Sequence, residues 1–339
     1  RISGGKFMLN GKSILVTGGT GSFGHQFVSY VLDHYEPKKI IIYSRDEYKQ
    51  FVMQNEYKNH AQADKLRFFI GDVRDKERLY RAFDGVDYVI HAAALKQVPS
   101  CEYNPMEAVK TNINGAMNIV DAALDRGVKR VVALSTDKAV NPINLYGGTK
   151  LVSDKLFIAA NAYAGEKDVN FSIVRYGNVA GSRGSVIPFF RNIVENGGTS
   201  LPITDYRMTR FWISLEQGVE LVIKALSEAR GGETFISKIP SFKITDLAQA
   251  LLPGCEMPEI GIREGEKLHE VMVTKEDSML TYEYDKHFIV YPHFDWWDTN
   301  KIQSGGKKVE KGFEYNSGAN TEWLSIEQIR ELLKTVEQH

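Results

Sequence analysis

The first half of the chain alternates between short apolar runs and longer stretches in which apolar residues recur at helical spacing. Helical spacing is clear in residues 22–35 and 105–127. The apolar runs predict buried strands within residues 12–19, 38–47, 65–75, 86–94, 128–138 and 169–179. Nearly continuous apolar strands separated by helices are typical of a parallel sheet covered on both faces. The pattern therefore predicts an α/β fold built on a doubly wound parallel sheet.

The second half of the chain loses this alternation after about residue 177, which indicates a smaller C-terminal lobe. Further helices are expected within residues 181–198, 214–230, 243–252 and 325–338. From about residue 255 the chain reads as short strands and polar turns. A length of 339 residues also exceeds the size at which a single core usually stops growing.

The expected division into domains is interleaved. The sheet domain covers residues 8–176 and also 212–236, and the C-terminal lobe combines residues 177–211 with 237–339. Met8 resembles a natural start, so residues 1–7 are expected to be an expression remnant.

Composition and charge argue against several classes of binding partner. Hydrophobic residues make up 43% of the chain, charged residues 25%, and the net charge is −1, which gives no sign of a nucleic-acid or membrane partner. No apolar run approaches the roughly 20 residues of a membrane span, and the start lacks the apolar segment of a signal peptide. Cys101 and Cys255 lack the paired spacing of a disulfide framework or zinc site. We therefore expect a cytoplasmic protein without a metal.

A glycine-rich segment, TGGTGSFG, lies between the first predicted strand and the first predicted helix. Small residues there let the backbone turn tightly and approach a pyrophosphate at a helix N-terminus. In this context the segment predicts a Rossmann-like dinucleotide-binding domain. The expected cofactor contacts in this loop are Gly18, Thr20, Gly21, Ser22, Phe23 and Gly24.

The end of the second strand reads YSRDE and bears on the choice of cofactor. An acidic residue at this point would hold a ribose 2′-hydroxyl and favour NAD. Here Ser44 and Arg45 come before Asp46, and Arg45 can pair with a 2′-phosphate, so NADP is favoured over NAD. The alternative is a solvated Arg45 with Asp46 as a helix N-cap. Cofactor contacts after the third and fourth strands are expected from Asp72, Val73, Ala92, Ala93 and Ala94.

Tyr146 and Lys150 stand four residues apart at the start of a predicted helix, so both face the same way. A phenol has a pKa of about 10, and a neighbouring cation lowers that pKa. Tyr146 could then take a proton from a substrate hydroxyl while hydride leaves the same carbon. The spacing predicts dehydrogenase chemistry, with both residues also contacting the cofactor.

These motifs together resemble the extended short-chain dehydrogenase/reductase superfamily from Met8 onward. The match is closest to its inverting UDP-N-acetylglucosamine 4,6-dehydratases, which open pseudaminic-acid and related bacterial sugar pathways. It is carried by TGGTGSFG, SRDE, GDVRD, HAAALKQVPSCEYNP, STDKAVNPINLYGGTK, RYGNVAGSRGSVIP, MTRF and REGEKLHE. The resemblance implies NADP-dependent loss of water from a UDP-sugar with inversion at C5, by a homo-oligomer that is a hexamer or a dimer.

Residues 136–138, Thr-Asp-Lys, separate a dehydratase from a plain epimerase. Thr136 can hydrogen-bond the substrate's 4-oxygen. By the resemblance, Lys138 is the base that takes the C5 proton, and Asp137 is the acid that protonates the departing C6 hydroxyl. These roles require a neutral Lys138 and a protonated Asp137, whereas a direct ion pair would favour both charged forms. The donor that returns a proton to C5 stays open, with Tyr146 as a candidate.

A UDP-sugar carries a diphosphate, so guanidinium groups should converge on it. Arginines 183, 210 and 263 are the candidates, and the resemblance adds contacts with sugar, uracil and ribose. The expected substrate-binding residues are Lys96, Asn178, Arg183, Val186, Thr204, Arg210, Arg263 and Glu266.

Two other interpretations of the sequence stay open. A retaining UDP-sugar 4,6-dehydratase or a UDP-hexose 4-epimerase of the same superfamily would share most of these motifs. An inactive dinucleotide-binding sensor or scaffold would show damage to the glycines or to the Tyr-Lys spacing, and neither is damaged in this sequence.

Overall fold

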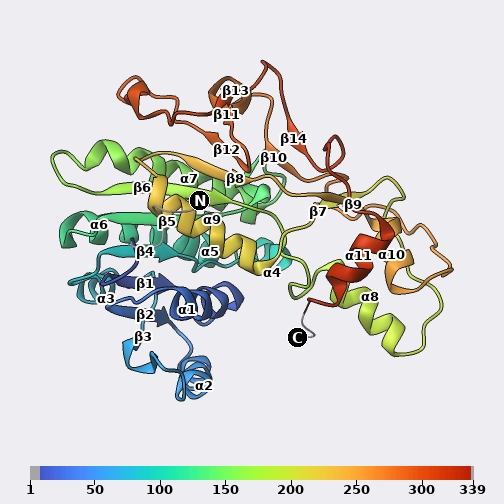
Figure 1. The fold of residues 1–339 in the computed structure, drawn as a ribbon, viewed down its shortest axis with the longest axis horizontal. Helices are drawn as coiled ribbons and strands as arrows, with labels where there is room; N and C mark the ends of the chain where they lie inside the picture. The colour runs from blue at the N-terminus through green and yellow to red at the C-terminus, as the bar shows by residue number, and fades with distance from the viewer. Residues whose placement is uncertain (1–7, 337–339) are drawn as a thin grey trace.

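A ten-stranded sheet forms the centre of the computed structural model, which describes residues 8–336. The expectation for residues 1–7 falls outside the described residues. The strand order is β13-β11-β12-β8-β6-β5-β4-β1-β2-β3, and the strands from β3 through β8 run parallel. Figure 1 shows β3 at one edge of the sheet and β13 at the other. The predicted α/β fold with a doubly wound parallel sheet is confirmed.

The six apolar runs each form a parallel strand. Branched aliphatic residues dominate them, as expected for strands buried on both faces. Their bounds are β1 (Ser13–Thr17), β2 (Lys39–Ser44), β3 (Leu66–Ile70), β4 (Tyr88–His91), β5 (Arg130–Ser135) and β6 (Asn170–Arg175).

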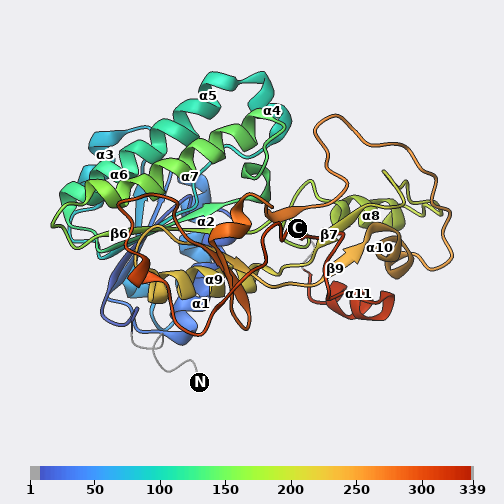
Figure 2. The same cartoon turned by 90° about the horizontal axis from the view of Figure 1, so that it is seen from above.

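Helices cover both faces of this sheet, as Figure 2 shows from above. One face carries α1 (Ser22–His34) and α9 (Leu215–Glu228), and α2 (Glu47–Tyr57) flanks β2 and β3. The opposite face carries α3 (Lys76–Ala82), α6 (Gly115–Arg126) and α7 (Leu145–Tyr163). Two buried apolar cores result, one on each side of the sheet.

Shorter helical segments link these elements. They are α4 (Val98–Tyr103), α5 (Pro105–Val109), a π-helical turn (Lys110–Asn114) and 3-10 turns at Ala63–Lys65, Asp137–Ala139, Asp277–Leu280 and Thr299–Lys301. The turn at Asp137–Ala139, labelled η3 below, directly follows β5.

The C-terminal half extends the large sheet. Strand β8 (Thr234–Ser237) lies parallel to β6, and the antiparallel strands β12 (His287–Val290), β11 (Thr281–Glu283) and β13 (Lys307–Lys308) follow it. The expected division assigned these last three strands to the C-terminal lobe, whereas their hydrogen bonds join them to the sheet. They are only two to four residues long, too short for a periodic pattern to reveal.

The second lobe lies beyond one end of the sheet in both views (Figures 1 and 2). Its own apolar core gathers α8 (Val186–Glu195), α10 (Ile244–Leu251) and α11 (Ile326–Leu333). Two small antiparallel pairs complete it, β7 (Thr209–Phe211) with β9 (Ser241–Lys243) and β10 (Val271–Val273) with β14 (Tyr315–Asn316).

None of the helices in residues 8–336 is both long enough and apolar enough to cross a membrane.

Candidate active site

The glycine loop joins β1 to α1 at the carboxyl end of the parallel strands. Gly18 has a φ of +64°, and a Cβ there would come within 2.9 Å of the Ala93 backbone. Gly24 packs directly on the Gly19 backbone, which brings the first turn of α1 close to the loop. Gly21 is the N-cap of α1, and no side chain caps this end. The uncapped helix end and the close backbone packing fit a pyrophosphate.

Thr17 joins the ends of the two neighbouring strands β1 and β4. Its hydroxyl oxygen accepts the backbone N–H groups of Ala92 and Ala93, at 3.1 and 3.2 Å, and lies 2.7 Å from Nδ1 of His91. Burial, aided by the charge of Lys150, lowers the pKa of His91 to about 3, so this imidazole stays neutral. His91 therefore fixes the strand ends rather than carrying a proton. The helices that follow β1 and β4 lie on opposite faces, which opens the crevice where such sheets bind ligands.

The residues after β2 and β3 form one charged cluster. Asp46 caps α2 by accepting the Lys49 N–H at 3.0 Å, as in the alternative drawn from the sequence. Arg45 is largely exposed, with Nη1 4.0 Å from an Asp72 carboxylate oxygen. Burial raises the pKa of Asp72, but hydrogen bonds from Arg74 outweigh it and leave that pKa below its ordinary value. Asp46 is thus engaged as a helix cap, while Arg45 keeps an exposed guanidinium in a long ion pair with Asp72.

Two other predicted cofactor residues lie near this cluster. Ser44 is buried, and its hydroxyl accepts the side-chain amide of Gln50 at 3.0 Å. The Val73 side chain lies in the apolar core, and Asn118 donates to its carbonyl at 3.0 Å.

The Tyr146–Lys150 pair lies on the buried side of α7. Asn144 caps this helix by accepting the Gly147 N–H at 2.8 Å. A Cβ on Gly147 would overlap the Lys138 carbonyl, so glycine lets α7 approach η3. Lys150 donates to the Leu134 carbonyl at 2.9 Å, which fixes its ammonium at the end of β5. The structure therefore places both side chains where the spacing predicted.

The protonation of this pair differs from the expectation. Burial, with the negative charges of Asp137 and Asp154, raises the pKa of Tyr146 above its ordinary value, although the Thr136 hydroxyl opposes this. Burial lowers the pKa of Lys150, and Asp154 opposes that shift. For the protein's own groups, burial and two carboxylates therefore raise the Tyr146 pKa, whereas the expected lowering also included the charge of a bound nicotinamide.

Asp154 is a site residue that the sequence analysis missed. It follows Lys150 by one helical turn, is 4% exposed, and accepts the Ser135 hydroxyl at 2.6 Å. Burial raises its pKa, while Lys150 and Arg175 counteract the rise. The sequence did contain a sign of Asp154: a lysine and an aspartate four residues apart, which share one side of a helix.

The Asp137–Lys138 pair lies in η3, immediately after β5. Thr136 caps this turn: its hydroxyl oxygen accepts the Lys138 N–H at 3.2 Å, and the hydroxyl donates to Asp137 at 3.1 Å. The Lys138 ammonium lies 3.7 Å from the Asp137 carboxylate, whose side chain is only 8% exposed. The structure thus shows Asp137 and Lys138 as a direct ion pair.

Side chains from the second lobe reach this pair. Asn178 accepts a hydrogen bond from the Lys138 ammonium at 3.3 Å. Lys267 donates to the Val140 carbonyl at 2.8 Å, at the end of η3. Burial lowers the pKa of Lys267, with Asp137 opposing and Lys138 reinforcing the shift. The sequence analysis named the motif REGEKLHE but did not single out Lys267 within it, because nothing local distinguishes this lysine from its charged neighbours.

The other predicted substrate residues lie on several loops. Lys96 is exposed between β4 and α4, Arg183 is exposed before α8, Val186 begins α8, and Thr204 is half-buried before β7. Arg263 and Glu266 share an exposed turn, in which the Arg263 N–H donates to the Glu266 carboxylate at 3.3 Å. Arg210 is occupied, because its guanidinium donates to the carbonyls of residues 209, 267 and 268.

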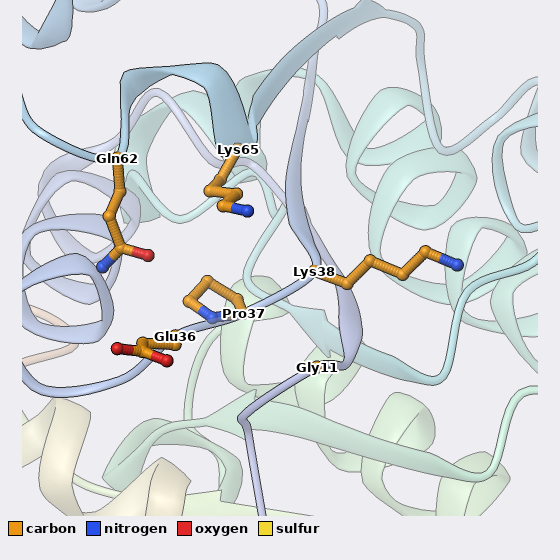
Figure 3. Close-up of a pocket in the computed structure, with 6 residues that line it drawn as sticks. All are labelled: Gly11, Glu36, Pro37, Lys38, Gln62 and Lys65. Carbon is orange, nitrogen blue, oxygen red and sulfur yellow. The ribbon is translucent and has the colours of Figure 1, made fainter.

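A hollow of about 550 Å³ lies away from these residues (Figure 3). Gly11, Lys38 and Lys65 line it at the starts of β1, β2 and β3, opposite the glycine loop. Gln62 in its wall already donates to the carbonyls of Leu32 and Tyr35. The hollow therefore does not belong to the candidate site.

Fold and site together define a class: short-chain dehydrogenase/reductase-like enzymes that act on sugar nucleotides. Within that class, the chain belongs to the polysaccharide biosynthesis protein family, whose profile matches residues 14–292. The resemblance seen in the sequence is confirmed.

The chain is similar over nearly its full length to curated enzymes. It is 54% identical over 336 residues to the UDP-N-acetylglucosamine 4,6-dehydratase (inverting) of Campylobacter jejuni subsp. jejuni serotype O:23/36 (strain 81-176), covering 97% of this chain and 99% of that one. It is 42% identical over 335 residues to the UDP-glucose 4-epimerase of Rickettsia canadensis (strain McKiel), covering 96% of each.

Solved structures agree on the architecture. Pen from Bacillus thuringiensis superposes with a TM-score of 0.84 at 37% identity, covering 96% of this chain and 98% of that one. DesIV, a dTDP-glucose 4,6-dehydratase from Streptomyces venezuelae with NAD bound, gives a TM-score of 0.65 at 25% identity, covering 76% and 86%.

Proposed function

We propose that this chain is an inverting UDP-N-acetylglucosamine 4,6-dehydratase, a hydro-lyase of bacterial surface-sugar biosynthesis. Its product would be a UDP-4-keto-6-deoxy-L-hexose. The observation that carries the proposal is the Asp137–Lys138 pair beside the Tyr146–Lys150 pair, in a chain 54% identical to such an enzyme. One pair suits hydride chemistry at C4, and the other supplies the acid and base that loss of water requires.

The first step is oxidation at C4. The glycine loop at Gly18, Gly21 and Gly24 would hold a dinucleotide, and that group would supply the hydride chemistry between C4 and C6. Tyr146 takes the proton of the 4-hydroxyl, and Thr136 hydrogen-bonds the 4-oxygen. Lys150, one helical turn along the same buried side of α7, is the cation that would stabilise the phenolate that this transfer requires, since an opposite charge favours the charged form. Asp154 in turn balances the charge of Lys150.

The second step removes water across C5 and C6. A ketone at C4 makes the C5 proton acidic, so that neutral Lys138 can take it while Asp137 protonates the departing C6 hydroxyl. The resting ion pair of 3.7 Å holds the proton on Lys138, so it first has to move to Asp137. A pyranose covering the pair excludes water, and low polarity favours two neutral groups over two charged ones. Tyr146 is our candidate for returning a proton to C5 on the opposite face.

NADP is the cofactor that we propose, with NAD as the alternative. Arg45 is exposed and close to the end of β2, and Asp46, the first acidic residue after that strand, is engaged as a helix cap. A 2′-phosphate has a cationic partner there. Competition between NADP and NAD for the purified protein tests this choice.

Substrate binding and assembly complete the proposal. Asn178 would orient the sugar beside Lys138, and Arg183 and Arg263 would hold the diphosphate. We further propose a cytoplasmic homo-oligomer of two or six chains. The exposed apolar side chains of Tyr103 and Met106, on α4 and α5, support association through the helices that flank the sheet.

Incubation with UDP-N-acetylglucosamine tests the reaction. We expect the mass of the sugar nucleotide to fall by one water, and NMR in deuterated water to show an inverted C5 that carries deuterium. Unchanged mass with altered C4 configuration would instead establish a 4-epimerase, the activity named for the 42% identical relative. Loss of water without inversion would establish a retaining dehydratase.

A further inference from the structure

One carboxylate that the proposed mechanism does not use is buried beside the active site. Glu270 comes just before β10 and is 5% exposed. Its Oε2 accepts the Phe211 N–H at 2.8 Å. Its backbone N–H donates to the Ser317 hydroxyl, and its carbonyl accepts the Ser317 N–H, both at 2.9 Å. These three hydrogen bonds fix both the backbone and the side chain of Glu270.

The second carboxylate oxygen faces the turn that carries Asn178. A Cβ on Gly177 would lie 3.1 Å from Oε1 of Glu270, a tight distance that places this carboxylate oxygen directly against the turn. The side-chain oxygen of the next residue, Asn178, accepts a hydrogen bond from the Lys138 ammonium at 3.3 Å. Glu270 therefore packs against the turn whose Asn178 side chain orients Lys138.

The charged groups around Glu270 come from several elements. Burial raises its pKa to about 7, the charge of Asp137 adds to the rise, and Arg210 on β7 and Lys138 on η3 oppose it. The effect of Asp137 on Glu270 is larger than that of Lys138. Lys267 faces the same pair from the segment before Glu270. An ionised Glu270 consequently repels the Asp137 carboxylate and attracts the Lys138 ammonium, and the repulsion is the larger of the two effects.

We propose that Glu270 is a positioning residue, whose fixed carboxylate behind the Gly177–Asn178 turn drives a proton from Lys138 to Asp137. One proton leaves the Lys138 ammonium and joins the Asp137 carboxylate, and both groups become neutral. This is the arrangement that removal of the C5 proton and departure of the C6 hydroxyl require. The inference rests on the proposed function, because it concerns the pair that performs the dehydration.

The test compares Glu270→Gln with the wild-type enzyme, using UDP-N-acetylglucosamine and NADP. Glutamine keeps the shape and still accepts the Phe211 N–H, but it carries no charge. We expect kcat for water release to fall about tenfold at pH 8, with KM and single-turnover C4 oxidation, followed by reduced-nicotinamide absorbance, unchanged. Wild-type dehydration should also decline as pH falls through the titration of Glu270, and this decline should vanish in the variant.

A matched control is Glu276→Gln, which removes an exposed carboxylate six residues further along and should behave as wild type. If Glu270→Gln keeps the wild-type kcat and pH profile, the inference is overturned while the proposed function stands. A wild-type protein that releases no water overturns both. Should the variant fail to fold, the wild type decides: a pH dependence of dehydration identical to that of C4 oxidation contradicts the inference.

Discussion

The Tyr146–Lys150 pair and the Asp137–Lys138 pair lie side by side but are held in different ways. A long helix, buried against the sheet and capped by Asn144, carries the first pair. A single 3-10 turn carries the second, and residues far away in sequence, Asn178 and Lys267, complete its surroundings. Helical spacing alone fixes the geometry of the first pair, whereas the second depends on how the two lobes meet.

Tyr146→Phe should have the largest effect, because it stops the step on which all others depend. Removing a positioned general base typically costs about 100- to 10,000-fold in rate. We expect losses of this size both in C4 oxidation, followed by nicotinamide absorbance, and in water release, followed by mass. Water release without measurable C4 oxidation would contradict the assigned order of steps.

Lys138→Ala should separate the functions of the two pairs. C4 oxidation should continue, because the Tyr146–Lys150 pair is intact, while water release falls by about 100-fold or more. Cofactor affinity, measured by calorimetry, should stay at the wild-type value. Wild-type dehydration in this variant would remove Lys138 from the mechanism.

Asp154→Asn tests how far the Tyr146–Lys150 pair depends on the buried negative charge of Asp154. Asparagine still accepts the Ser135 hydroxyl but leaves the buried Lys150 without a negative neighbour. We expect C4 oxidation to slow about tenfold and the free energy of unfolding to drop by about 1–3 kcal/mol. Asp168→Asn, at a side chain that is 92% exposed, is the control for both measurements. Equal behaviour of the two variants would argue against a role for Asp154.

The smallest effect concerns stability against pH. The pKa of Glu270 is about 7 in the folded protein, against an ordinary value of 4.5, so between these values the folded state binds a proton that the unfolded state has lost. Stability therefore falls as pH rises through this window. Relative to Glu270→Gln, the wild type should lose on the order of 1–3 kcal/mol of unfolding free energy from pH 4.5 to 7. Denaturant melts at several pH values measure this, and parallel curves would show that Glu270 does not titrate there.

The sequence predicted the part of the molecule in which local pattern and final structure agree. Apolar runs located β1 to β6, and the i, i+4 spacing placed Tyr146 and Lys150 on one side of α7. It did not reveal Glu270 or Lys267, because both lie in a stretch of charged residues, typical of a surface loop. Only the pairing of β10 with β14 and the packing of the second lobe bury Glu270 more than 130 residues after Asp137. Contacts of such long range have no local signature.

The second lobe consists of three separate passes of the chain, between β6 and α9, between β8 and β11, and after β13. Each pass leaves the large sheet and returns to it, apart from the last. Such a lobe cannot be exchanged between relatives as one cassette without carrying β8, β11, β12 and β13 of the large sheet along with it. Divergence toward new sugars within this architecture must therefore proceed by point changes and short insertions in the connecting loops.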